Sequence, residues 1–218
     1  MKKIINLFLA MVIAGTMMPL VTFANEEVKP LAMLSDVSTV DLNLDGLVLT
    51  TEYHPFEIRA VKMDHDEIYI LDAQNGEMKE IIHFYEEVST YNYSQFFVLR
   101  DKYDGPVKTT VEVVLELWSS GSFRQINRVL SHKIFASGNS STTLEDKSTQ
   151  VSSLTGAYPT SGVNISGSGV ITQVTTTLTS GSFSLSALQS AGFTVSSSSG
   201  TTRYLRKYTA VTGSYRVY

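Results

Sequence analysis

Apolar and polar residues alternate along most of the chain. In the clearest example, within residues 107–118, every second position from Val111 to Leu117 is apolar, and Glu112 and Glu116 lie between them. A period of two places successive side chains on opposite faces of a β-strand. Similar runs occupy residues 39–51, 56–63, 67–72, 94–100 and 123–135. The pattern predicts an all-β fold of antiparallel, sandwich-like sheets, built as two units with at most one or two short helices.

Residues 77–88 can be interpreted in two ways. Their apolar positions fit one face of a helix, but the preceding Asn75-Gly76 turn signal favours a strand that returns along its neighbour. We expect a strand here. A short helix is expected at residues 185–191, where Ser184 can act as the N-cap and Gly192 follows the end.

The first 24 residues have the features of a secretory signal peptide. Lys2 and Lys3 precede a mostly apolar segment, and Thr22-Phe23-Ala24 places small residues at the positions that signal peptidase requires. Polar interruptions and Pro19 argue against a permanent membrane anchor, which needs about 20 clean apolar residues. We therefore expect cleavage after Ala24, a secreted product and no membrane span in it. The absence of cysteine indicates a bacterial origin rather than a eukaryotic secretory one.

Charge is unevenly distributed in the remaining chain. It holds 15 basic and 21 acidic residues, a net charge of −6, and all the acids lie before residue 147. Residues 147–218 carry five bases, 29 serines and threonines, and short β-type runs. This asymmetry predicts an acidic N-terminal β domain at residues 25–140 and a Ser/Thr-rich basic β domain at residues 151–218. Residues 141–150 have no apolar period and are interpreted as a linker.

One segment matches a calcium-binding pattern. Residues 41–52 place Asp41, Asn43, Asp45 and Glu52 at the spacing of oxygen ligands in a calcium loop, with Gly46 at the turn. The same segment is also two alternating apolar runs joined by Asp45-Gly46, a strong hairpin signal. Leucines occupy positions that calcium loops give to polar residues, so we favour the hairpin. Calcium remains the one candidate cofactor.

The sequence shows no catalytic motif. The four histidines, His54, His65, His83 and His132, lack zinc-binding spacings, and no serine lies in a nucleophile elbow. Glu112 and Glu116 share a strand face about 13 Å apart, farther than a pair of glycosidase carboxylates. We therefore expect a protein without catalytic residues.

Two features are candidates for ligand binding. Trp118, the only tryptophan, falls on the more polar face of its strand, where its ring could stack on a sugar or a partner, although partial burial under a loop is favoured. Near the C-terminus, basic and aromatic residues alternate, which could bind an anionic polymer or could simply form an amphipathic hairpin. These residues are Arg203, Tyr204, Arg206, Lys207, Tyr208 and Arg216.

These observations predict a secreted, non-enzymatic protein with an interaction or structural role, and a bacterial cell surface is the candidate place for it. The expected partner is a cell-wall polymer or another extracellular protein, and the negative net charge argues against nucleic acid. Two alternatives remain open. One is a secreted hydrolase or inhibitor whose site is assembled from scattered residues, and the other is a calcium-stabilised binding module.

Overall fold

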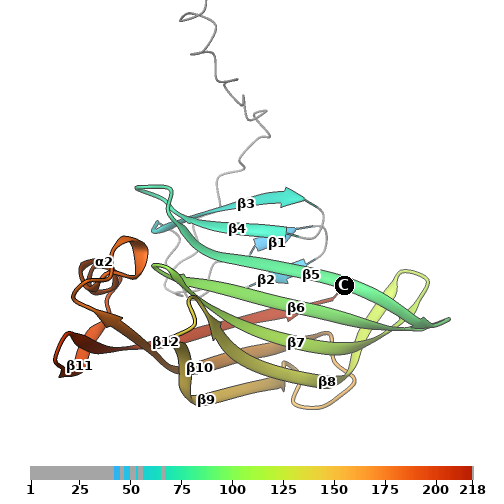
Figure 1. The fold of residues 1–218 in the computed structure, drawn as a ribbon. Coiled ribbons are helices and arrows are strands. Elements are labelled where there is room, and N and C mark those ends of the chain that lie inside the picture. The colour runs from blue at the N-terminus through green and yellow to red at the C-terminus, as the bar shows by residue number, and fades with distance from the viewer. Residues whose placement is uncertain (1–41, 45–46, 50–52, 54–55, 65–66, 218) are drawn as a thin grey trace, which may run out of the picture. The chain divides into compact units, whose positions relative to one another are not determined.

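The fold consists almost entirely of antiparallel strands (Figure 1). The computed structural model describes residues 42–44, 47–49, 53, 56–64 and 67–217. The predicted signal peptide lies outside the described residues. In the described part of the chain, twelve strands form two sheets of six.

The first sheet is a meander in which each strand pairs with the next one along the chain. Its strands are β3 (Ile58–Asp64), β4 (Glu67–Asp72), β5 (Met78–Thr90), β6 (Tyr93–Asp104), β7 (Val107–Ser120) and β8 (Phe123–Ser137). Figure 1 shows β5 to β8 as long strands running side by side. Gly76, Gly105 and Gly121 have positive φ at the turns, a conformation that glycine adopts without strain.

The second sheet has the order β1-β2-β12-β10-β9, with β11 also paired to β12. Its strands are β1 (Leu42–Leu44), β2 (Leu47–Leu49), β9 (Thr142–Ser153), β10 (Gly162–Thr176), β11 (Thr194–Ser199) and β12 (Thr202–Arg216). Between β10 and β11 lie the 3-10 helix η1 (Gly181–Phe183) and the helix α2 (Leu185–Ser190). The Ser184 hydroxyl accepts a hydrogen bond from the Ala187 N–H and caps α2.

Both sheets contribute to one hydrophobic core. The inward positions of β7 are buried and apolar from Val111 to Leu117, and they belong to the same cluster as Val163 and Ile171 of β10. The sheets approach closely at Gly167, where a Cβ atom would lie 2.5 Å from Cγ2 of Val111. Glycine is therefore required for this spacing.

Charged side chains also join the two sheets. Arg100 of β6 contacts both carboxylate oxygens of Glu80, and its Nη1 donates to the main-chain oxygen of Thr212 at 2.7 Å. Lys102 donates to the Ala210 oxygen at 2.7 Å. Thr212 and Ala210 lie in the part of β12 between the residues that pair with β11 and those that pair with β2. Arg100 and Lys102 therefore satisfy main-chain oxygens along this edge of β12.

A third cation, Lys207, connects β12 to the end of β6 and to α2. Its Nζ lies 2.6 Å from Oδ1 of Asp104 and donates to the Ala191 oxygen at 2.6 Å. Asp104 also accepts a hydrogen bond from the Thr209 hydroxyl. These contacts fix the end of α2 against the turn between β6 and β7.

The predicted all-β, antiparallel, sandwich-like fold is confirmed, as are the strand over residues 77–88 and the helix that begins after Ser184. Within the described residues 42–44 and 47–49, the expected hairpin is confirmed by the antiparallel pairing of Leu44 with Leu47. The linker predicted at residues 141–150 is wrong, because residues 142–150 lie in β9, which pairs with β10. Its threonines and serines suit a strand with an exposed face, so a polar composition was mistaken for a loop.

Candidate functional site

The candidate site is the outer face of β5–β8, meaning the side of that sheet turned away from the other sheet. Strand register places outward side chains in rows across the four strands. One row runs Tyr85, Phe97, Val114 and Ser131. Neighbouring rows mix aromatic and charged side chains, so the face combines apolar surface with polar groups.

Tyr85 and Phe97 form the centre of this face. Their rings lie parallel, with centroids 4.4 Å apart and an interplanar angle of 8°. Tyr85 is 43 % exposed. Two stacked rings on adjacent strands support each other's orientation, so the exposed surface of Tyr85 is held rigidly. The pair is therefore a preformed platform.

A shallow depression of about 410 Å³ lies beside this platform. Tyr85, Leu99 and Phe135 supply its apolar wall. Its polar lining consists of His83, Asp101, Lys108, Thr110 and Ser137. A depression that combines an apolar wall with polar groups can orient a small ligand or one unit of a polymer.

The polar groups of the depression form a connected chain. His83 lies between two carboxylates, with Nδ1 3.0 Å from Oε1 of Glu67 and Nε2 3.6 Å from Oδ2 of Asp101. Asp101, which is buried, also accepts hydrogen bonds from Lys108 at 2.7 Å and from Thr110 at 2.5 Å. The hydrogen bond to Asp101 raises the pKa of Lys108, so this lysine stays charged.

A second group of rings lies at the other end of the same face. Trp118 is half-buried and packs edge-on against the exposed Phe123, with centroids 5.9 Å apart. Tyr93, which is 40 % exposed, lies directly opposite Trp118 on β6. The partial burial expected for Trp118 is observed, and Phe123 at the start of β8 provides its aromatic contact.

Polar side chains border this second group of rings. Glu116 accepts hydrogen bonds from Asn127 at 3.0 Å and from Arg128 at 2.9 Å. The bond from Arg128 is the main cause that lowers the pKa of Glu116, and the same bond raises the pKa of Arg128. Together with Tyr93 and Thr90, these three residues line a depression of about 520 Å³.

The basic and aromatic residues predicted near the C-terminus do not form one surface. Tyr204, Arg206 and Tyr208 project from one face of β12, and Arg206 is paired with Glu145 of β9 at 2.8 Å. Lys207 faces the other way and is paired with Asp104.

The remaining two basic residues lie apart from that group. Arg203 donates to the main-chain oxygens of Gly200 and Thr202. Arg216 is exposed, eight residues beyond Tyr208, or about 27 Å along the strand.

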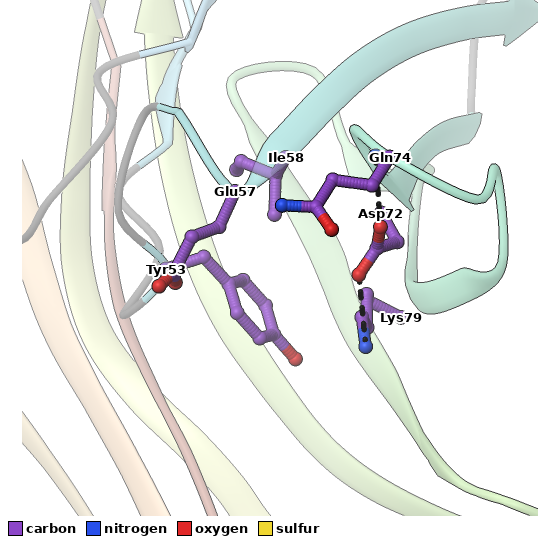
Figure 2. A pocket seen from close by; sticks show the side chains of 6 residues that line it. All are labelled: Tyr53, Glu57, Ile58, Asp72, Gln74 and Lys79. Atoms are coloured by element: carbon purple, nitrogen blue, oxygen red, sulfur yellow. Dashed lines mark hydrogen bonds and ion pairs between the residues drawn. The ribbon is translucent and has the colours of Figure 1, made fainter.

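Another depression, of about 350 Å³, lies at the β3–β5 end of the first sheet. Figure 2 shows the Tyr53 ring on one side and the Asp72–Lys79 pair, at 3.3 Å, on the other. Glu57, Ile58 and Gln74 complete its lining. Main-chain N–H groups of Asn75 and Gln74 donate to Asp72 and lower the pKa of its carboxyl. Asp72 therefore stabilises the β4–β5 turn.

The proposed calcium ligands are only partly within the described chain. Asn43 lies in β1, opposite Val48, while Asp41, Asp45 and Glu52 fall outside the described residues. Among the described side chains, no three His, Asp or Glu residues are grouped so that they could hold a metal ion.

Sequence reasoning singled out Trp118 but missed the platform and the polar chain. Tyr85 lies in a segment whose pattern fits both a helix and a strand, and His83 and Asp101 lie on different strands, so no local pattern brings them together. The signal lay in the turn at Tyr91-Asn92: folding β5 against β6 across it pairs Tyr85 with Phe97 and His83 with Leu99.

No family model, curated protein or solved structure matches the chain. Among the residues that the structure describes, no helix is both long and apolar enough to cross a membrane. The site is therefore interpreted from its own geometry.

Proposed function

We propose that this protein is a secreted, non-catalytic binding protein that attaches to a bacterial cell-wall polymer through the outer face of β5–β8. The Tyr85–Phe97 stack carries the proposal, because it is an exposed aromatic platform whose orientation is fixed before any ligand arrives. Pre-organised rings lose little conformational entropy on binding, so more of the contact energy appears as affinity.

Sugar polymers suit such a platform. One face of a sugar ring presents C–H groups and can lie on an aromatic ring, while the hydroxyls at its edge can bond polar side chains. Lys108 and His83 are partly exposed beside the platform in this way, while the buried Asp101 holds Lys108 in place. The geometry thus offers both kinds of contact at one place.

A retention assay on insoluble cell wall tests the proposal. The wild-type protein should be retained, and Tyr85→Ala should weaken retention about tenfold, as expected for losing a central aromatic contact of about 1.4 kcal/mol. The matched control is Tyr208→Ala, which removes an equally aromatic and 67 % exposed ring from the other sheet. It should bind like wild type. Loss of retention by the control alone, or no retention at all, would overturn the proposal.

One observation favours a second candidate, a hydrolase acting on the same polymer. His83 contacts Glu67 and Asp101 at the edge of a depression, and an imidazole between two carboxylates can move a proton. Release of soluble fragments from the wall by wild type, but not by His83→Ala, would support this candidate. Retention without release supports the binding protein.

A further inference from the structure

We infer that the ligand of the outer face is an uncharged, hydroxyl-rich polysaccharide that extends along β6 and β7 and contacts both groups of rings. This inference rests on the proposed function and names the ligand class of the same site. It follows from the spacing of the rings, from the pairing of the charges and from what lies between the rings.

The two groups of rings are separated by four residues on each central strand. Phe97 and Tyr93 differ by four positions on β6, and their partners Val114 and Trp118 do so on β7. At strand rise this is about 13 Å. A single sugar ring does not span that distance, so a ligand that uses both groups must be an extended chain.

The cations of this face are already neutralised. Lys108 lies 2.7 Å from Asp101, Arg128 lies 2.9 Å from Glu116, and Lys133 lies 2.8 Å from Glu112. An anionic polymer would have to displace these carboxylates. The outward positions of β5–β8 also include the acid Glu87, so the face carries no excess positive charge that would attract such a polymer.

The same pairs suit hydroxyl groups. A paired ammonium or guanidinium keeps N–H groups that can donate to a sugar hydroxyl, and the partly exposed carboxylates of Glu112 and Glu116 keep lone pairs that can accept from one, whereas Asp101 is buried. Hydroxyls need no net charge on the protein. The charge arrangement therefore selects for a neutral ligand.

A protein partner fits this surface less well. The row of Gln95, Glu116 and Arg128 lies between the two groups of rings and interrupts the apolar area. The centres of protein interfaces are instead depleted in charged residues. Separate rings with polar groups between them match a chain of alternating apolar faces and hydroxyl edges.

The test compares cell wall before and after chemical removal of its anionic polymers, at low and at high salt. We expect wild-type retention to survive the removal and to change less than about twofold between about 50 and 500 mM salt, because screening affects charge attraction and not stacking. Uncharged cellulose, chitin and mannan serve as defined probes. At least one of them should retain the protein.

Variants of Trp118 test whether the second group of rings takes part in binding. Trp118→Ala should weaken retention on the stripped wall about fivefold. Trp118→Phe keeps a ring, so it should lower the logarithm of retention by less than half as much as Trp118→Ala does. A thermal melt of each variant separates lost binding from lost folding. Tyr208→Ala is again the control.

The outcomes distinguish this inference from the proposed function. If retention depends on Tyr85 but disappears when the anionic polymers are removed, or falls more than tenfold with salt, the ligand is anionic and the inference is wrong while the proposed function stands. Retention abolished by protease treatment of the wall would mean a protein partner and would also overturn the inference. If no wall preparation retains the protein, both fail.

Discussion

Arg100 of β6 and Glu80 of β5 form a buried, two-point ion pair within the first sheet. Nε of Arg100 lies 2.5 Å from Oε1 of Glu80, Nη2 lies 3.1 Å from Oε2, and both side chains are 2 % exposed. The third guanidinium nitrogen reaches Thr212 of the other sheet. The pair therefore links neighbouring strands of one sheet to the edge of the second.

Removing one partner of this pair should destabilise the fold. Glu80→Ala leaves a buried guanidinium without its carboxylate, and we expect the free energy of unfolding to fall by about 3–5 kcal/mol in urea titrations. Glu116→Ala is the control, because its partner Arg128 is 65 % exposed and an exposed pair contributes less than about 1 kcal/mol. Equal losses of unfolding free energy in the two variants would show that the buried Arg100–Glu80 pair stabilises the fold no more than an exposed pair does.

The close approach of the sheets at Gly167 gives a second prediction. Gly167→Ala places a methyl group against Val111 and should cost about 1–3 kcal/mol through overpacking. The cost should shrink when the same change is made in a Val111→Ala background, where space is available. A double-mutant cycle measures this coupling. Additive losses would mean that the two residues do not limit the spacing.

The lowered pKa of Asp72 leads to the prediction that the stability of the fold depends on pH. Its pKa is lower in the folded protein than its ordinary value of 3.8. The stability it contributes is therefore fully present above that value and is lost as the pH falls through the folded-state pKa. Asp72→Asn keeps an acceptor for the turn but does not titrate. Its Tm should fall less steeply than that of wild type between about pH 4 and pH 2, and parallel curves would contradict the assignment.

The hairpin at residues 42–49 predicts the response to calcium. Leu42–Leu44 pairs antiparallel with Leu47–Leu49, so Asn43 lies within a strand of a hairpin rather than in the loop of an EF-hand. Tm should be the same in calcium and in chelator, since a ligand that does not bind cannot stabilise the folded state. A Tm that rises with calcium concentration would restore the metal-binding alternative.

Much of the fold could be predicted because alternation is a local signal. The strand through residues 107–118 and the hairpin at Asp45-Gly46 are visible in a few consecutive residues, as is the Ser184 cap of α2. The strand over residues 142–153 could not be predicted, because β9 is rich in serine and threonine and no local pattern distinguishes such a strand from a polar linker.

The site was harder to predict because it depends on register. His83 and Asp101 meet only when β5 and β6 are paired with the observed register, which places Ile81 opposite Asp101. For Arg206 and Lys207, by contrast, the sequence alone shows that the side chains separate. Adjacent residues on a strand point to opposite faces, so the two were never able to belong to one binding surface.

Trp118 allows the most direct test of whether the outer face of β5–β8 is the binding surface. As the only tryptophan, it gives a fluorescence signal from that face alone. Titration with a soluble fragment of a retained polysaccharide should change its emission saturably and protect it from a soluble quencher, in wild type and in Tyr208→Ala alike. Unchanged emission and quenching at concentrations where the protein is fully bound would contradict the account.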